Sequence, residues 1–150
     1  MIYKCLEALH HCHSLGITHR DIKPENIMFG KDGEVRLVDF GLAKDTKHHM
    51  KAYAGTPYFM APEVIKGYYT HKCDIWSLAC VLYMLMAGHL PYTGSSREEV
   101  FEKIRNARYR NEPNFSEELA SLLQQMFTVD PVNRPTALEC KSHPWFKSQL

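Results

Sequence analysis

Apolar residues recur along two stretches of the chain with the spacing of an amphipathic helix. In residues 1–15 they lie three and four positions apart, and Gly16 follows where such a helix would end. The apolar positions of this stretch are Ile2, Cys5, Leu9 and Cys12. After Ser116 the same spacing returns at Leu119, Leu122, Leu123, Met126 and Phe127. Between the two stretches, residues 74–87 are apolar at nearly every position, which predicts a helix that is buried on all sides.

Helix-capping patterns predict two further helices. Ser95-x-x-Glu98 and Ser96-x-x-Glu99 both have the form of a capping box, and we expect a helix from there to about Ala107. Thr136-x-x-Glu139 predicts a last short helix.

Short apolar runs before residue 42 predict strands instead. Residues 27–29 and 35–38 flank an Asp-Gly turn at 31–34, which is typical of a β-hairpin. Residues 42–60 are rich in Lys, His, Thr and Tyr without periodicity, and we expect a long exposed loop, of the kind that is usually functional. One hairpin followed by a run of helices predicts a mainly helical α+β unit.

Composition excludes several classes of protein. The 150 residues are 45% hydrophobic and 23% charged, which is a globular balance and not that of a disordered chain. Eighteen Lys and Arg against seventeen Asp and Glu give a net charge of +1, so we expect neither a nucleic-acid nor a membrane partner. The apolar run 75–87 is too short to span a bilayer, and residues 1–15 lack the pattern of a signal peptide. Five scattered cysteines without a C-x-x-C pair favour reduced thiols and an intracellular, cytoplasmic location.

Polar residues with possible catalytic chemistry lie at both ends of the predicted hairpin. Because a hairpin brings its ends together, Asn26 and Asp39 should meet at one edge and offer the oxygen ligands that Mg²⁺ prefers. Asp21 and Lys23, two positions apart on an extended segment, can face the same side. A carboxylate to accept a proton, an ammonium to hold phosphate and a metal site together indicate phosphoryl transfer.

Three ordered motifs carry a resemblance to a known family. They are His19-Arg20-Asp21-Ile22-Lys23-Pro24-Glu25-Asn26, then Asp39-Phe40-Gly41, then Gly55-Thr56-Pro57-Tyr58-Phe59-Met60-Ala61-Pro62-Glu63. This series resembles the C-terminal lobe of a eukaryotic Ser/Thr protein kinase, and the resemblance covers nearly the whole chain. It implies transfer of the γ-phosphate of ATP to Ser and Thr hydroxyls of protein substrates.

The resemblance also implies a role for each matching residue. Asp21 would be the catalytic base and Lys23 the phosphate contact, while Asn26 and Asp39 would hold Mg²⁺. The residues implied in binding ATP are Lys23, Glu25, Asn26, Met28 and Asp39.

Other matching residues would shape the site rather than react. Arg20 would organise the activation segment, which starts with Phe40 and Gly41, and the hydroxyl of Thr56 would bind the catalytic loop. His19 and Phe40 would stack, Glu63 would pair with Arg134, and Asp74 would hold the backbone of the catalytic loop. Lys23, Pro24 and Thr56 match the Ser/Thr branch of the family rather than the tyrosine branch.

Residues 72–77 and 88–92 look most like the calcium/calmodulin-dependent group, including calcium-dependent kinases. No calcium-binding loop motif occurs in the sequence, so a calcium sensor or regulatory segment could only lie outside these residues. Ala52 stands where many kinases carry an activating phosphothreonine, so we expect loop control through Thr46, Tyr53 or Thr56 instead.

The family's Gly-rich loop and V-A-I-K lysine, which belong to the N-terminal lobe, do not occur in residues 1–150. We therefore interpret the chain as a partial kinase domain with its N-terminal lobe absent. One alternative is a catalytically inactive lobe that acts as an interaction or regulatory module. Another is a metal-dependent hydrolase that uses Asp21 and Asp39.

Overall fold

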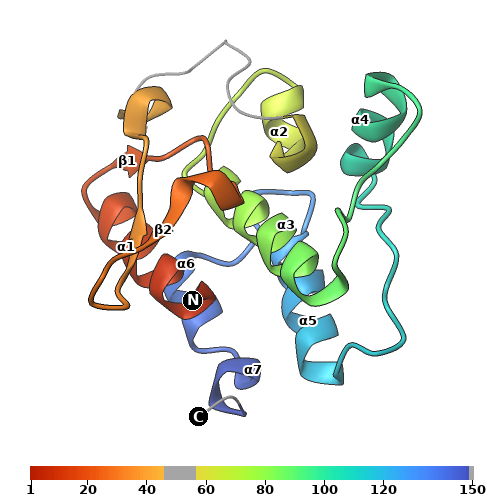
Figure 1. Ribbon diagram of the computed structural model, residues 1–150. Coiled ribbons are helices and arrows are strands. Elements are labelled where there is room, and N and C mark those ends of the chain that lie inside the picture. The colour runs from red at the N-terminus through yellow and green to blue at the C-terminus, as the bar shows by residue number, and fades with distance from the viewer. Residues whose placement is uncertain (46–56, 149–150) are drawn as a thin grey trace.

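The chain folds around one central helix, with smaller elements on both sides of it. The computed structural model describes residues 1–45 and 57–148, apart from the side chains of 42, 44 and 45. The helices are α1 (Ile2–Ser14), α2 (Pro62–Ile65), α3 (Cys73–Ala87), α4 (Arg97–Arg105), α5 (Glu117–Met126), α6 (Ala137–Lys141) and α7 (Pro144–Lys147). The strands are β1 (Ile17–Thr18), β2 (Ile27–Phe29), β3 (Val35–Leu37) and β4 (Lys44–Asp45). Figure 1 shows α3 in the middle, with α1 and the strands on one side and α4 on the other.

Helix α3 forms the centre of the hydrophobic core, since the residues from its start through Tyr83 are buried with the exception of Ser77. Trp76 and Tyr83 are fully buried, and Trp76 packs edge-on against Phe127 of the segment after α5. The prediction of burial on all sides is wrong for the last turn, because Leu85 and Met86 are exposed. The apolar composition of the helix therefore extends one turn beyond the core.

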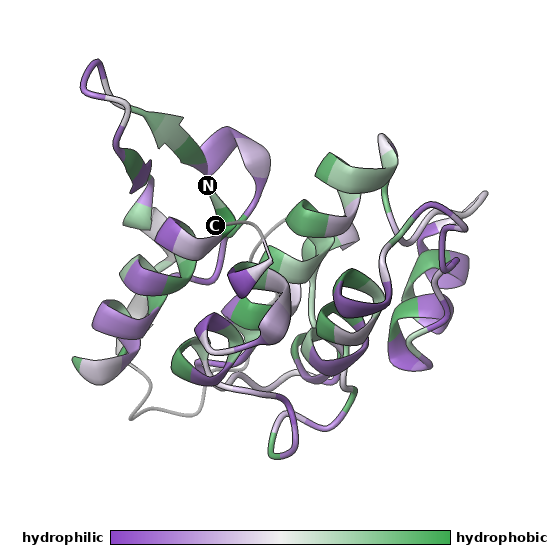
Figure 2. Ribbon diagram, turned by 90° about the horizontal axis from the view of Figure 1, so that it is seen from below, coloured by the Kyte–Doolittle hydropathy of each residue, from purple (hydrophilic) through white to green (hydrophobic). Residues whose placement is uncertain are grey.

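The two predicted amphipathic helices bury the predicted faces. In α1 the side chains of Ile2, Cys5 and Leu9 are buried, together with Leu6, and the helix packs against α6 and α3. In α5 the buried positions are those of the predicted stripe. Figure 2 shows helices that carry both hydrophobic and hydrophilic residues, as amphipathic helices do.

The predicted hairpin is present as β2 and β3. Ile27 pairs with Leu37 and Phe29 with Val35 in an antiparallel register, and Gly33 in the connecting turn has φ +78°. The predicted long loop at 42–60 is partly wrong. Its first residues form β4, which pairs with β1, and its last residues form a 3-10 turn, Pro57–Phe59, in which Phe59 is buried.

Side-chain caps fix the starts of the C-terminal helices. Ser96 accepts a hydrogen bond from the backbone of Glu99, and Thr136 and Glu139 form a complete capping box at α6. The carboxylate of Glu99 binds the backbone and hydroxyl of Ser95, so neither predicted box at α4 is complete. Helix α4 ends at Arg105, two residues before the predicted end, and α7 follows the helix that was predicted to be the last. None of the helices in the described residues is long and apolar enough to cross a membrane.

Candidate active site

The loop between β1 and β2 is held by a buried carboxylate of α3. Oδ2 of Asp74 accepts a hydrogen bond from the backbone N–H of His19, and Oδ1 accepts one from that of Arg20, each at 2.9 Å. Arg20 has φ +73°, a left-handed conformation that a non-glycine residue adopts only under constraint. The expected contact between Asp74 and this loop is present, and it fixes the backbone immediately before Asp21.

A histidine that the sequence analysis did not assign completes this arrangement. Nε2 of His13, near the end of α1, lies 2.8 Å from Oδ2 of Asp74, and both side chains are buried. The ring of His71 packs against that of His13 at 5.0 Å. His13 lies four positions after Leu9, on the buried face of α1, and this position was the only signal in the sequence that it contacts the core.

Asp21, Lys23 and Asn26 form the centre of the candidate site. Nζ of Lys23 lies 3.3 Å from Oδ2 of Asp21. Nδ2 of Asn26 donates to the same oxygen at 3.2 Å and to the backbone carbonyl of Asp21 at 2.8 Å. Asp21 is only 8% exposed. Its carboxylate is held by the ammonium of Lys23 and the amide of Asn26.

Asn26 and Asp39 lie at the open ends of the same hairpin, as the sequence predicts. The backbone N–H of Val38 donates to the carbonyl of Asn26 at 2.9 Å, which brings residue 39 next to the start of β2. Asp39 has the left-handed backbone angles φ 58° and ψ 69°, and its exposed carboxylate accepts a hydrogen bond from the backbone of Gly41 at 3.3 Å.

This donor set fits Mg²⁺. Both hydrogen bonds of the Asn26 side chain use Nδ2, so its Oδ1, like the carboxylate of Asp39, is a suitable oxygen ligand. In the part of the chain that the structure describes, no three His, Cys, Asp or Glu side chains converge as a metal site. A magnesium ion held by Asn26 and Asp39 would therefore complete its shell with water and substrate phosphate, which is its usual behaviour.

Two residues that were predicted to bind ATP lie outside this cluster. Glu25 is exposed in the 3-10 turn Pro24–Asn26, and its carboxylate has no ion pair among the described residues. Met28 is 52% exposed on β2, where it pairs in register with Arg36. Among the described residues, no hydrogen bond or ion pair joins either side chain to Asp21 or Asn26.

His19 joins the loop to the segment after the hairpin. Its Nδ1 accepts a hydrogen bond from the backbone of Asp21 at 3.2 Å, so the ring proton lies on Nε2, which donates to the carbonyl of Val38 at 2.9 Å. The expected contact with Phe40 is present, with ring centroids 4.5 Å apart and planes inclined by 57°. Phe40 itself remains 41% exposed.

The expected pair between Glu63 and Arg134 is present and fully buried. Two guanidinium nitrogens lie 2.7 and 2.9 Å from the two carboxylate oxygens, a bidentate geometry. Arg134 also donates to the backbone carbonyls of Lys72, Thr128 and Val129. The pair thus joins α2 to the segment before α6, and all parts of the guanidinium have partners.

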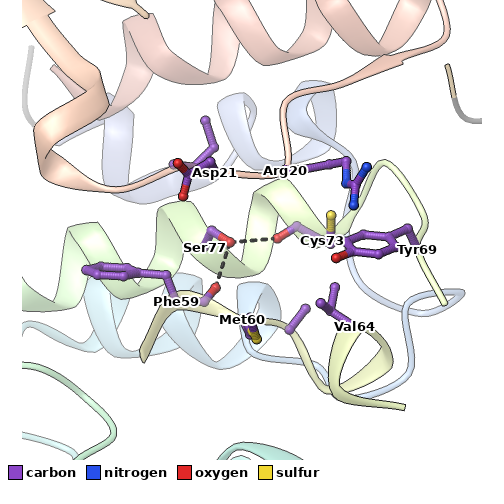
Figure 3. A pocket seen from close by; sticks show the side chains of 10 residues that line it. Arg20, Asp21, Phe59, Met60, Val64, Tyr69, Cys73 and Ser77 are labelled. Carbon is purple, nitrogen blue, oxygen red and sulfur yellow. Dashed lines mark hydrogen bonds between the residues drawn. The ribbon is translucent and has the colours of Figure 1, made fainter. Parts of the chain in front are cut away.

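Arg20 lines a small pocket together with residues of α2 and α3. Figure 3 shows its guanidinium beside the ring of Tyr69. The distance from the guanidinium carbon to the ring centroid is 4.2 Å, a cation–π contact that the sequence did not indicate. Ser77 donates to the carbonyl of Phe59 at 2.7 Å and so ties the 3-10 turn Pro57–Phe59 to α3. Thr56, Thr46, Ala52 and Tyr53, on which further predictions depend, lie outside the described residues.

Comparison with known proteins decides which family shares this arrangement. Residues 1–146 match the family described as the protein kinase domain. The chain belongs to the protein kinase family. This membership confirms the resemblance drawn from the three motifs, and the mainly helical fold with its hairpin agrees with it.

Individual kinases match over almost the whole chain. Calcium-dependent protein kinase 3 of Plasmodium berghei is 38% identical over 95% of this chain. The serine/threonine-protein kinase cds1 of Schizosaccharomyces pombe is 39% identical over 97% of the chain, and sperm motility kinase 3A of Mus musculus is 40% identical over 93%. The alignments cover only 27%, 35% and 29% of these relatives, so the chain spans about a third of their length or less.

Proposed function

We propose that residues 1–150 form the C-terminal lobe of a Ser/Thr protein kinase and supply the catalytic base and the metal ligands for phosphate transfer from ATP. The observation that carries the proposal is the contact of Lys23 and Asn26 with one carboxylate oxygen of Asp21, at 3.3 and 3.2 Å. It holds a proton acceptor beside a cation that can bind phosphate, and both lie next to the ligands for Mg²⁺. The similarity to Ser/Thr kinases, calcium-dependent ones among them, agrees with Ser and Thr as the acceptor residues.

In the proposed reaction, the substrate hydroxyl oxygen forms a bond to the γ-phosphorus while the bond from phosphorus to the β–γ bridging oxygen breaks and ADP leaves. Oδ1 or Oδ2 of Asp21 accepts the hydroxyl proton. The Lys23 ammonium binds a γ-phosphate oxygen and stabilises the charge that develops there. Asn26 and Asp39 would hold Mg²⁺, which when bound neutralises charge on the phosphate oxygens.

The proposal can be tested in a chimera in which the N-terminal lobe of a related kinase precedes residue 1. Asp21→Asn should lower kcat by about 10²–10⁴-fold at unchanged affinity for Mg-ATP, because it removes the base without removing a metal ligand. Asp39→Asn should instead weaken Mg-dependent nucleotide binding. Asp32→Asn, at an exposed carboxylate of the hairpin turn, is the matched control and should leave both quantities unchanged. Equal loss of nucleotide affinity in the Asp21 and Asp39 variants would contradict the division of roles.

The two alternatives predict other outcomes of the same experiment. A folded chimera that labels no peptide, with or without Asp21, would support an inactive interaction module. Release of inorganic phosphate without labelled peptide, abolished by Asp21→Asn, would support a hydrolase. Control by a calcium sensor or regulatory segment would have to come from residues outside this chain, as the missing calcium-loop motif implies.

A further inference from the structure

The side chain of Arg20 carries a permanent positive charge and is nevertheless buried beside the candidate active site. Arg20 is 7% exposed, and its guanidinium carbon lies 4.2 Å from the centre of the Tyr69 ring. A cation is attracted by the negative face of an aromatic ring, and the attraction is larger where water is excluded. Figure 3 shows the side chain of Arg20 directed toward Tyr69. This contact therefore joins the catalytic loop to the segment between α2 and α3.

The ring of Tyr69 is itself held by the hydrophobic core. Tyr69 is half-buried and packs against the core residues. Val64 of α2 and Cys73 of α3 line the same pocket as Arg20 and Tyr69. The space left in this pocket is about 10 Å³, which is about the volume that one water needs. The pocket is therefore too small for a ligand, and the guanidinium has little room to move away from the ring.

The backbone of Arg20 needs support at both ends of the residue because of its conformation. Its φ is +73°, in the left-handed region that a non-glycine residue adopts only where its surroundings impose it. Asp74 accepts a hydrogen bond from its backbone N–H at 2.9 Å, and Tyr69 contacts the far end of its side chain. The next residue is Asp21, so a rotation about the backbone bonds of Arg20 would move the Asp21 carboxylate away from Lys23.

We propose that Tyr69 is a positioning residue for the phosphate transfer and acts on Asp21 through Arg20. The inference rests on the proposed function, because it concerns the placing of the proposed base. The ring of Tyr69 fixes the Arg20 side chain, that side chain opposes relaxation of the left-handed backbone, and the backbone directs the carboxylate of Asp21. A displacement of about 1 Å can lower the rate about 10²-fold, so loss of the ring should affect kcat rather than the binding of either substrate.

The chimera that tests the proposed function also tests the role of Tyr69. Tyr69→Leu should lower kcat by about ten- to hundredfold at unchanged KM for Mg-ATP and for the peptide. Tyr69→Phe keeps the ring face and should retain most of the activity. Tyr68→Leu, at the neighbouring tyrosine that is 42% exposed, is the matched control and should leave kcat unchanged. An unchanged kcat in Tyr69→Leu, or an equal loss in Tyr69→Phe, would overturn the inference.

Two further variants test whether Tyr69 acts through Arg20. In the background of Arg20→Met, Tyr69→Leu should cause no further loss of kcat, because the cation that the ring holds is already absent. A trifluorinated phenylalanine in place of Tyr69 keeps the shape of a phenylalanine but weakens the negative face of the ring, so kcat should be lower than in Tyr69→Phe. This comparison remains decisive if Tyr69→Leu is unstable. Additive losses in the double variant, or equal kcat with and without fluorine, would contradict the proposal.

Hydrogen exchange separates a failure of this inference from a failure of the proposed function. The backbone N–H of Asp21 is buried and donates to Nδ1 of His19 at 3.2 Å, so its exchange reports how firmly the loop is held. In the chimera, Tyr69→Leu should speed this exchange at least about tenfold, and Tyr68→Leu should not. A chimera that labels no peptide but shows this effect would refute the proposed function and leave the placing of Asp21 by Tyr69 intact. An active chimera with unchanged exchange would overturn the inference alone.

Discussion

Asp74 determines the geometry of the catalytic loop although it takes no part in the proposed chemistry. Its two oxygens accept hydrogen bonds from two successive backbone amides and contact the ring of His13, and the side chain is inaccessible to water. Several contacts depend on this one carboxylate. Each buried donor that loses its acceptor lowers the stability of the folded chain by about 1–3 kcal/mol.

We therefore predict that Asp74→Asn lowers the free energy of unfolding of the 150-residue chain by about 3 kcal/mol. The asparagine amide nitrogen cannot accept from either His19 or Arg20, and one backbone N–H would be left without a partner. Urea unfolding followed by circular dichroism measures the effect, with the exposed Asp32→Asn as control. A loss below about 1 kcal/mol would mean that the loop is held mainly by other contacts.

The buried pair of Glu63 and Arg134 gives a second prediction for single residues. Glu63→Gln should destabilise the chain by about 3–5 kcal/mol, because it leaves the guanidinium charge buried without its counter-charge. Arg134→Met in the same background should recover part of that loss, since it removes the uncompensated charge. Urea unfolding of the single and double variants measures both effects, and a double variant less stable than Glu63→Gln would contradict the explanation.

Among the secondary-structure elements, α7 begins at a cap formed by a titratable side chain. His143 caps it, with Nδ1 accepting a hydrogen bond from the backbone of Trp145 at 3.2 Å, so the cap requires an unprotonated nitrogen. Burial lowers the pKa of His143 below its usual value of 6.5, and burial, with His13 and Lys72 nearby, lowers the pKa of His71 as well.

The sign of the pH dependence follows from these two shifts. A histidine whose folded-state pKa is lowered contributes stability that is present above pH 6.5 and is lost as the pH falls through the folded-state pKa. We expect the free energy of unfolding to fall as the pH drops below about 6.5, where the unfolded chain takes up protons that the folded chain does not yet bind. His143→Asn, which keeps a capping acceptor but does not titrate, should reduce this slope. An unchanged slope would show that His143 does not contribute to it.

The long helices and the hairpin could be predicted from the sequence because their signals are local. The stripe of α5 and the Asp-Gly turn each specify an element from neighbouring residues alone. Strand β4 could not be predicted, since two residues become a strand only by pairing with β1 from a distant part of the chain. Helix α7 has only four residues, and its cap is a histidine rather than one of the usual capping residues.

The candidate site was predictable for a different reason. Asp21, Lys23, Asn26 and Asp39 occupy recognisable motifs, and the hairpin brings the last two together. The contacts of His13 and Tyr69 with Asp74 and Arg20 join different elements and depend on how these pack. No motif in the sequence marks either contact.

For the molecule as a whole, the 150-residue chain should show no measurable kinase activity and only weak binding of Mg-ATP. The described residues that we propose to hold phosphate and metal are Lys23, Asn26 and Asp39. A magnesium ion held by one carboxylate and one amide would depend on the nucleotide for further ligands. Calorimetric titration of Mg-ATP and phosphate transfer to a basic peptide measure the two properties. Robust turnover that is lost in Asp21→Ala would show that this lobe catalyses alone.

The pairing of Glu63 with Arg134 also has a consequence for the order in which the protein can fold during synthesis. The two residues are 71 positions apart, so a ribosome must add 71 residues after Glu63 before its partner is made. Until then the Glu63 carboxylate is more stable in water than in a core, which opposes early docking of α2. Nascent chains stalled before residue 134 should therefore remain sensitive to protease around α2 and α3, and those stalled well beyond it should become resistant.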